Sequence, residues 1–291
     1  MNTASTPSQL GRHVQSRTNP SPPVFRTRAL VGARSLGFVA GASVVLMAGL
    51  VGCEEQTVSS TQSTASTSHN ASDSEQSGPL SETLNARYEQ YQQQADDETK
   101  RIYKAGIEAV AQSGVLERAK NQGDNAPAFT LPDADGKDVS LASLLAEGPI
   151  VLVWYRGGWC PYCNLTLRAF AEKVPEIAEA GGRLVAISPE LPDNTAATVS
   201  KNGIDYTVLS DVGNKVAQEF GVVFSLTPEV HAKYNAAFNF DSHNGQDSGQ
   251  LPLAATYVID REGVIRYAFL DADYTKRAEP SEVVEALKAL P

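Results

Sequence analysis

Apolar and polar positions divide the 291-residue chain into four stretches of different character. Residues 36–52 form one uncharged apolar run, whereas residues 53–80 are rich in Ser, Thr and Gln and contain almost no large apolar side chain. Residues 81–122 carry widely spaced apolar side chains and no proline, which predicts a helical N-terminal extension. From residue 123 onward, short apolar runs alternate with amphipathic stretches. This alternation predicts a folded domain over residues 123–291.

The apolar runs of this domain predict strands, and the stretches between them predict helices. Residues 150–155 are apolar without interruption, as in a central strand that is buried on both faces. The predicted strands cover residues 150–155, 183–188, 206–209, 256–260 and 264–270, and the predicted helices cover residues 165–179, 194–202, 212–220 and 280–290. Strands that alternate with helices and end in a hairpin predict the α/β class, here a three-layer α/β/α sandwich with a central mixed sheet. Residues 222–252 do not fit the alternation and are predicted to be an insertion that contains a helix at 228–238.

The distribution of charge along the chain indicates where in the cell the protein is located. Residues 1–53 contain five arginines and no acidic residue, so with a net charge of -10 for the whole chain the remainder carries -10 - 5 = -15. A basic segment followed by an apolar run predicts a secretory signal peptide over residues 1–52. Residues 50–53 read LVGC and resemble the bacterial lipoprotein cleavage box, which implies that Cys53 is acylated. An uncleaved membrane anchor is the alternative.

Both readings predict an extracytoplasmic protein that is anchored to a lipid membrane. Residues 53–80 then form a flexible tether, because such a polar segment cannot bury enough apolar surface to offset the entropy of ordering it. The acidic body argues against nucleic acid as a partner, since phosphate binding needs clustered Lys and Arg. The four histidines are scattered and suggest no metal site, and no cofactor is predicted.

Cys160 and Cys163 stand in the sequence WCPYC, directly after the apolar strand and at the predicted start of a helix. A helix N-terminus stabilises a thiolate, so Cys160 is expected to have the lower pKa and to attack, with Cys163 as the resolving thiol. Pro161 fits the first helical turn. Two other readings are possible. The first reading is half of a zinc site, which is disfavoured because the sequence has no second cysteine pair. The second is a purely structural disulfide, which would stabilise the protein little because closing so short a loop removes little entropy from the unfolded chain.

Five blocks of the sequence together resemble the peroxiredoxin-like branch of the alkyl hydroperoxide reductase/thiol-specific antioxidant family. They read APAFTLPDADGKDVSLASL, YRGGWCPYCNLTLRAF, LVAISPE, YTVLSDVGN and ATYVIDREGVIRYAF. The resemblance implies a thioredoxin fold and a thioredoxin-dependent peroxidase that reduces hydrogen peroxide and small organic hydroperoxides. Cys160 would become a sulfenic acid, Cys163 would condense with it to form the disulfide Cys160–Cys163, and a thioredoxin-like dithiol would restore both thiols.

The chain departs from the family pattern at the residues that support the peroxide-reactive cysteine. Gly157 stands where the family has Thr or Ser, and Ala254 stands where the family has an arginine that polarises peroxide. Arg156 and Arg168 are candidate substitutes, and Arg156 is favoured because Arg168 is expected to face away. The proline and tyrosine inside the motif also resemble glutaredoxins, which keeps open a membrane-tethered thiol–disulfide oxidoreductase that acts on exported proteins. A non-catalytic module that binds a partner through residues 222–252 is a third hypothesis.

Overall fold

The computed structural model of the chain describes residues 78–245 and 247–291. The predicted signal peptide, the acylated Cys53 and nearly all of the predicted tether lie outside these residues. Within the described part, no helix is both long and apolar enough to cross a bilayer. The described residues comprise the helical extension and the predicted α/β domain.

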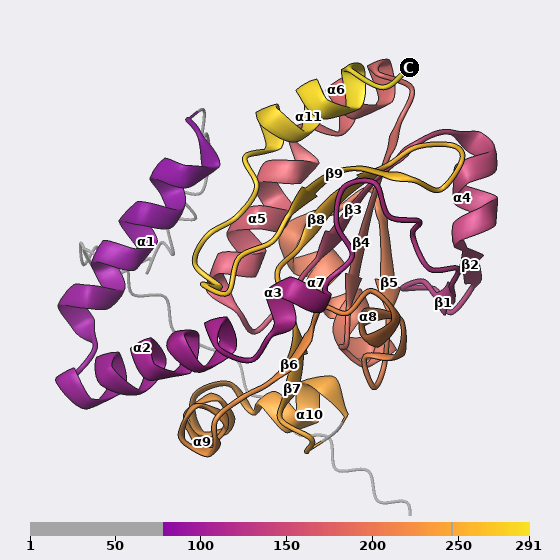
Figure 1. Cartoon of the computed structure of the whole chain (residues 1–291). Helices are drawn as coiled ribbons and strands as arrows, with labels where there is room; N and C mark the ends of the chain where they lie inside the picture. Colours follow the sequence, from indigo (N-terminus) through magenta and orange to yellow (C-terminus); the bar gives the residue numbers. More distant parts are fainter. Residues whose placement is uncertain (1–77, 246) are drawn as a thin grey trace, which may run out of the picture. The chain divides into compact units, whose positions relative to one another are not determined.

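A mixed five-stranded sheet forms the centre of the protein, with the strand order β5-β4-β3-β8-β9 (Figure 1). Its strands are β3 (Ile150–Trp154), β4 (Arg183–Ser188), β5 (Thr207–Ser210), β8 (Thr256–Ile259) and β9 (Ile265–Phe269). The strand pairs β3–β4 and β4–β5 are parallel, whereas β3–β8 and β8–β9 are antiparallel. Every residue of β3 is buried, as its uninterrupted apolar sequence predicts.

Helices cover both faces of this sheet (Figure 1). One face is packed against α5 (Pro161–Ala171), α6 (Val174–Glu179), α7 (Pro192–Asn202) and α11 (Pro280–Lys288). The other face is packed against α4 (Leu141–Glu147) and α8 (Lys215–Glu219). A two-stranded hairpin of β1 (Thr130–Pro132) and β2 (Asp138–Ser140) precedes α4. The fold is therefore the predicted thioredoxin-like three-layer sandwich.

One helix predicted from the sequence is two helices in the structure. The stretch 165–179 was expected to be continuous, but α5 begins earlier, at Pro161, and α6 begins at Val174. Pro175 lies in the first turn of α6, and a proline in the interior of a single helix would remove a backbone hydrogen bond and clash with the preceding turn. The earlier start of α5 is important for the site, because it places Cys160 at the N-cap.

The predicted extension 81–122 is helical but broken. It forms α1 (Leu80–Gln94), α2 (Asp97–Ala111) and the short α3 (Val115–Arg118). The break falls at Asp96, which has an extended backbone and accepts a hydrogen bond from the Thr99 N–H at 2.8 Å. An Asp in this position is a strong N-cap, so it starts a new helix rather than continuing the old one.

The predicted insertion 222–252 is a hairpin with two helices between its strands. Strands β6 (Val223–Ser225) and β7 (Gln250–Pro252) pair in antiparallel fashion and enclose α9 (Pro228–Phe238) and α10 (Phe240–Asn244). The helix predicted at 228–238 is confirmed, with Thr227 as its N-cap. Helices α2 and α9 lie against each other, so segments distant in the sequence meet beside the sheet.

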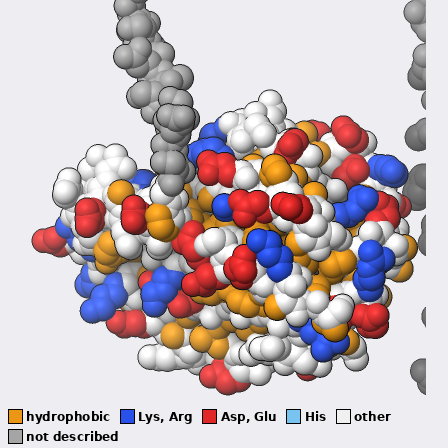
Figure 2. Space-filling model, turned by 90° about the horizontal axis from the view of Figure 1, so that it is seen from above, with side chains coloured by type: hydrophobic (Ala, Val, Ile, Leu, Met, Phe, Trp, Pro, Cys, Tyr) orange, Lys and Arg blue, Asp and Glu red, His pale blue; other side chains and the backbone are white. Residues whose placement is uncertain are grey.

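The surface of the described part carries both signs of charge. Figure 2 shows one face on which acidic and basic side chains are interspersed around apolar ones. This face therefore presents no broad basic surface of the kind that binds nucleic acid.

Candidate active site

The loop that leads from β3 to α5 is shaped by two glycines. Gly157 has φ 147°, and a side chain there would overlap the Trp159 indole. A side chain at Gly158 would overlap the hydroxyl of Thr198. Residues with a Cβ are therefore excluded at both positions, and the tight loop brings the WCPYC segment to the start of α5.

Cys160 and Cys163 are free thiols at the beginning of α5, as the sequence predicts. Cys160 is the N-cap of the helix, and Pro161 occupies its first turn. Both side chains are buried, with exposed fractions of 1% for Cys160 and 0% for Cys163. Cys160 nevertheless lines a pocket that opens toward the extension, together with Tyr91 of α1.

Two arginines contact the two sulfur atoms. Arg156 Nη1 lies 3.6 Å from Cys160 Sγ, and the Arg156 backbone N–H lies 3.5 Å from Cys163 Sγ. Arg277, in the segment before α11, places its Nη2 3.6 Å from Cys163 Sγ. Arg156 is buried, whereas Arg277 is half-buried. The dithiol thus lies in an electropositive environment that favours a thiolate.

The two thiols interact directly and share the same two arginine charges. Burial raises the pKa of the Cys160 thiol. Burial acts in the same direction on Cys163, but hydrogen bonding from the Cys160 thiol and the charges of Arg277 and Arg156 lower the pKa of Cys163 overall. Because the two thiols titrate together, the pair holds one proton between its two sulfurs, and the attacking role of Cys160 stays a prediction.

The Arg156 guanidinium is enclosed by aromatic rings. It lies 5.1 Å from the centre of the Trp159 ring, 4.9 Å from that of Tyr234 and 4.3 Å from that of Tyr274. These contacts compensate part of the cost of burying its charge. Arg156 also lines a pocket with Ala254, the position at which the family pattern has an arginine. The structure thus brings a guanidinium to a place where this chain lacks the family residue.

Arg168, the other candidate, is directed elsewhere. Its Nη1 donates to Asn202 Oδ1 at 2.9 Å, on the side of α5 that faces α7. Of the two arginines that the sequence offered, only Arg156 contacts a cysteine sulfur among the described residues.

A buried carboxylate, Glu190, supports the loop from behind. Its oxygens accept hydrogen bonds from the Gly158 N–H at 2.9 Å, the Tyr155 hydroxyl at 3.1 Å and the Thr198 hydroxyl at 3.1 Å. Glu190 has no exposed surface, and burial raises its pKa to about 7 despite these hydrogen bonds. His243 Nδ1 lies 3.7 Å from the same carboxylate. Glu190 therefore holds the loop in place and titrates near neutral pH.

Sequence reasoning missed Glu190 and Arg277. Arg277 is 114 residues from the cysteine that it contacts, and Glu190 is 32 residues from the glycine that it binds. The Glu190 position, directly after a predicted strand that would lie next to 150–155, was the one available signal. Among the described residues, no group of three or more His, Cys, Asp or Glu side chains is arranged to hold a metal ion.

Comparisons with known proteins place this site in a family. A sequence model of the AhpC/TSA family matches residues 122–268. The chloroplastic peroxiredoxin Q of Suaeda salsa is 32% identical over 191 residues, which cover 65% of this chain and 72% of the relative. The chain belongs to the AhpC/TSA family. Another relative in this family, the chloroplastic peroxiredoxin Q of Arabidopsis thaliana, is 29% identical over 64% of this chain and 76% of its own.

The solved structures that resemble this AhpC/TSA family member include peroxidoxin BcpB from Mycobacterium tuberculosis. It is 25% identical, with a TM-score of 0.47, and the match covers 59% of this chain and 98% of the other. Peroxiredoxin Q from Xanthomonas campestris matches with 18% identity and a TM-score of 0.43, over 59% of this chain and 96% of the other. The family resemblance read from the sequence is confirmed by the family model and by the peroxiredoxin Q relatives.

Proposed function

We propose that this protein is a thioredoxin-dependent peroxidase in which Cys160 attacks the peroxide and Cys163 resolves the product. Its membership in a family of peroxiredoxins makes it an oxidoreductase that acts on peroxides. The observation that carries the residue assignment is that Cys160 and Arg156 line one pocket, with Arg156 Nη1 3.6 Å from Cys160 Sγ. A peroxide in this pocket meets a sulfur nucleophile and a hydrogen-bond donor together.

The proton that the two thiols share supplies the acid for this step. As the Cys160 thiolate forms a bond to one peroxide oxygen, the O–O bond breaks and the proton held by Cys163 passes to the departing oxygen. That oxygen leaves as water or an alcohol, and Arg156 stabilises its developing charge. Cys160 is oxidised to the sulfenic acid, and the peroxide is reduced by two electrons.

Resolution uses the same pair. The Cys163 thiolate attacks the sulfur of the Cys160 sulfenic acid, the departing hydroxide takes a proton from solvent and becomes water, and the Cys160–Cys163 disulfide forms. Arg277 keeps Cys163 reactive by stabilising its thiolate. A thioredoxin-like dithiol then reduces the disulfide, and its own thiols are oxidised in exchange.

The test is the rate at which the reduced protein reacts with hydrogen peroxide, followed by Trp159 fluorescence because this indole lies beside Cys160. A rate far above that of a free thiol supports a site that activates the O–O bond. A rate equal to that of a free thiol, together with fast exchange with a disulfide substrate, contradicts the peroxidase. The relatives are named as peroxiredoxins, which favours peroxide over the exported-protein substrates of the alternative oxidoreductase.

For its location, we propose a lipoprotein on the extracytoplasmic side of a membrane, anchored through acylated Cys53. The basic segment, the apolar run 36–52 and the LVGC sequence support this proposal. Mass spectrometry of the mature N-terminus tests it: a diacylglyceryl group on Cys53 is expected, and a Cys53→Ala variant should lose it. An unmodified Cys53, or an N-terminus upstream of it, contradicts the proposal.

A further inference from the structure

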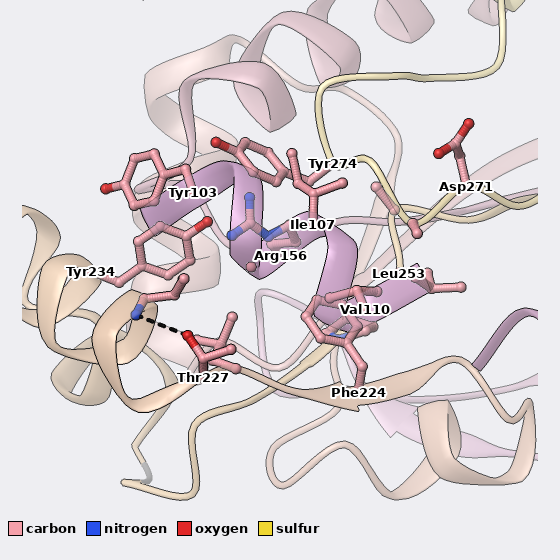
Figure 3. Close-up of a pocket in the computed structure, with 16 residues that line it drawn as sticks. Tyr103, Ile107, Val110, Arg156, Phe224, Thr227, Tyr234, Leu253, Asp271 and Tyr274 are labelled. Carbon is pink, nitrogen blue, oxygen red and sulfur yellow. Dashed lines mark hydrogen bonds between the residues drawn. The ribbon is translucent and has the colours of Figure 1, made fainter. Parts of the chain in front are cut away.

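Cys160 lines a pocket that is too small to admit part of another protein. The pocket has a volume of about 60 Å³, and about 10–15 Å³ of such space holds one water molecule. Its walls include three tyrosines that surround the Arg156 guanidinium in Figure 3, namely Tyr103, Tyr234 and Tyr274. A hydrogen peroxide molecule fits a space of this size, whereas a cysteine carried on the surface of a protein does not.

The step that regenerates the dithiol needs more room. A thioredoxin-like dithiol must bring its own sulfur into contact with Cys160 or Cys163, because exchange passes through a mixed disulfide. The exposed fractions of the two side chains are only 1% and 0%. Part of the structure must therefore move before a protein reductant reaches either sulfur.

Helix α1 is an element that covers the cysteine pair. Its Leu80 and Leu84 belong to the same buried apolar cluster as both cysteines, and α1 contacts α5 directly. Further along α1, Arg87 and Tyr91 line the pocket that contains Cys160. Because α1 precedes residue 122, where the match to the family begins, this cover belongs to the chain's extension rather than to the family domain.

The attachment of α1 rests on few buried contacts. Its buried residues are Leu80 and Leu84, both in the first five positions of a 15-residue helix. A cleft of about 510 Å³ separates α1 from residues 269–277, and another of about 560 Å³ separates it from α2. At its start, the Glu279 carboxylate accepts hydrogen bonds from the Leu80 and Ser81 N–H groups. Such an element can open locally while the rest of the domain stays folded.

We propose that α1 undocks from α5 to admit the thioredoxin-like dithiol, which then binds the face of α5 that α1 covers. The proposal rests on the peroxidase function proposed above and names the surface that its reductant uses. Peroxide reacts while α1 is docked, because it fits the small pocket. The two halves of the catalytic cycle thus use two different forms of the protein.

Reduction on the open form begins at Cys160, because this residue lines the pocket beneath α1. A thiolate of the partner attacks Cys160 Sγ, the bond to Cys163 breaks, and Cys163 leaves as a thiolate that Arg277 stabilises from 3.6 Å. The second thiol of the partner loses its proton to solvent and attacks the mixed disulfide, and Cys160 leaves as a thiolate. Two electrons pass from the partner, whose dithiol becomes a disulfide.

Two rates measured on the same protein test the proposal. One is the oxidation of the dithiol by hydrogen peroxide. The other is the reduction of the Cys160–Cys163 disulfide, prepared with the thiol oxidant diamide, by a reduced bacterial thioredoxin. Leu84→Ala should raise the rate of reduction by about 30-fold, because loss of a buried leucine side chain shifts the opening equilibrium by about that factor. The rate of oxidation should not change.

Leu144→Ala is the matched control for this variant. It is the same substitution at a similarly buried position, with an exposed fraction of 7% against 5% for Leu84, but it lies in α4 on the opposite face of the sheet. An unaltered rate of reduction in Leu84→Ala overturns the proposal, as does an equal rise in Leu144→Ala or an equal rise in the rate of oxidation. Glu279→Ala keeps both leucines and should raise the rate of reduction about 5-fold, so it serves as a second variant if Leu84→Ala does not fold.

A trapped complex tests where the partner binds. A thioredoxin whose second cysteine is replaced should form a stable mixed disulfide with Cys160 in the Cys163→Ser variant. Hydrogen exchange in α1 should be faster in this complex than in the free variant, while exchange in β3 should not change. Protection of α1 that persists in the complex contradicts undocking.

Failure of the peroxidase proposal can be told apart from failure of this one. If the reduced protein reacts with hydrogen peroxide no faster than a free thiol does, the peroxidase proposal fails. Diamide still prepares the disulfide, and the reduction rates of Leu84→Ala and Leu144→Ala then decide whether α1 controls access. If thioredoxin reduces the disulfide of neither the unaltered protein nor Leu84→Ala, the proposal for α1 is overturned whatever the rate with peroxide.

Discussion

The two sides of the redox site are built by regions of different character. On one side, the fully buried strand β3 leads into the loop that carries Arg156 and into the start of α5, where Cys160 and Cys163 lie. On the other side lies what we call the cap, namely residues 80–111 together with the insertion 222–252. The cap contacts the site through aromatic rings: the Tyr234 ring lies 5.3 Å from the Trp159 ring, centre to centre, and its centre is 4.9 Å from the Arg156 guanidinium. The sheet side carries the cysteines, whereas the cap supplies part of the wall of the pocket that Cys160 lines.

The two regions are also attached differently. The β3 strand pairs with β4 and β8 along its whole length, so it opens only when the domain unfolds. The cap is joined to the domain by long-range polar contacts, such as that of Asn194 Nδ2 with the His243 carbonyl oxygen at 2.9 Å, and by apolar contacts of α1 with α5. We therefore expect changes on the sheet side to affect chemistry strongly and changes in the cap to affect access and selectivity.

The largest effect should come from the cysteines themselves. Cys160→Ser should abolish peroxide turnover, because no sulfur then lines the pocket. Cys163→Ser should consume about one equivalent of peroxide without recycling, because the resolving thiol is lost. The measurement is peroxide consumption with and without a thioredoxin-like reductant. If Cys160→Ser kept the single-equivalent reaction and Cys163→Ser lost it, the attacking role would belong to Cys163.

Removal of the Arg156 charge should have the second-largest effect. Arg156→Met should lower kcat/KM for every peroxide by about 100- to 1000-fold, the usual loss when one donor to a developing negative charge is removed. Arg168→Met is the matched control, since Arg168 donates to Asn202 and contacts neither sulfur. Steady-state kinetics of the two variants decide the matter. Similar losses in both would mean that Arg156 acts through stability rather than through the reacting oxygen.

The sheet side was also the part that the sequence predicted well. The apolar run at 150–155 and the proline at 161 fix the geometry of the cysteine pair locally, because the sequence signals for a strand and for a helix N-terminus are each contained within a few residues. The position of Arg156 beside the cysteines follows directly from its place in the same loop. Glu190 and Arg277 could not be predicted to join the site, because only the tertiary fold brings residues so distant in sequence to it.

The cap was predicted less well. A helix was expected throughout 81–122, yet the chain breaks at Asp96, where the local N-cap signal is stronger than the weak apolar periodicity around it. The helix at 228–238 was predicted correctly from its proline and apolar spacing, but its position against α2 depends on side-chain packing.

A third prediction concerns stability on the sheet side. The pKa of Glu190 is about 7 in the folded protein, against an ordinary value of 4.5. Because the folded state holds this proton more tightly than the unfolded state, Glu190 stabilises the folded state most below about pH 4.5. About 3 kcal/mol of this stabilisation is lost as the pH rises to about 7. Glu190→Gln should remove this dependence.

Urea unfolding of the two proteins across that pH range measures the difference. Both should be in the disulfide form, so that neither cysteine titrates. The free energy of unfolding of the unaltered protein should fall relative to that of Glu190→Gln as the pH rises. An equal pH dependence in the two proteins would mean that the Glu190 carboxyl is ionised throughout, and its hydrogen bonds to the loop would then be those of a carboxylate.

The smallest expected effect concerns the cap, and it measures how tightly α1 is docked on the domain. Glu279 accepts hydrogen bonds from the Leu80 and Ser81 N–H groups at 2.9 and 3.1 Å, and so caps α1 from the opposite end of the chain. Glu279→Ala should weaken the docking of α1 by about 1 kcal/mol, which is about 5-fold in a local opening equilibrium. Hydrogen exchange of α1 and the reaction of Cys160 with a bulky thiol reagent should both accelerate by that factor, while exchange in β3 should not change. Acceleration in β3 as well would show that the cap and the sheet open as one unit, and the distinction between them would then be structural only.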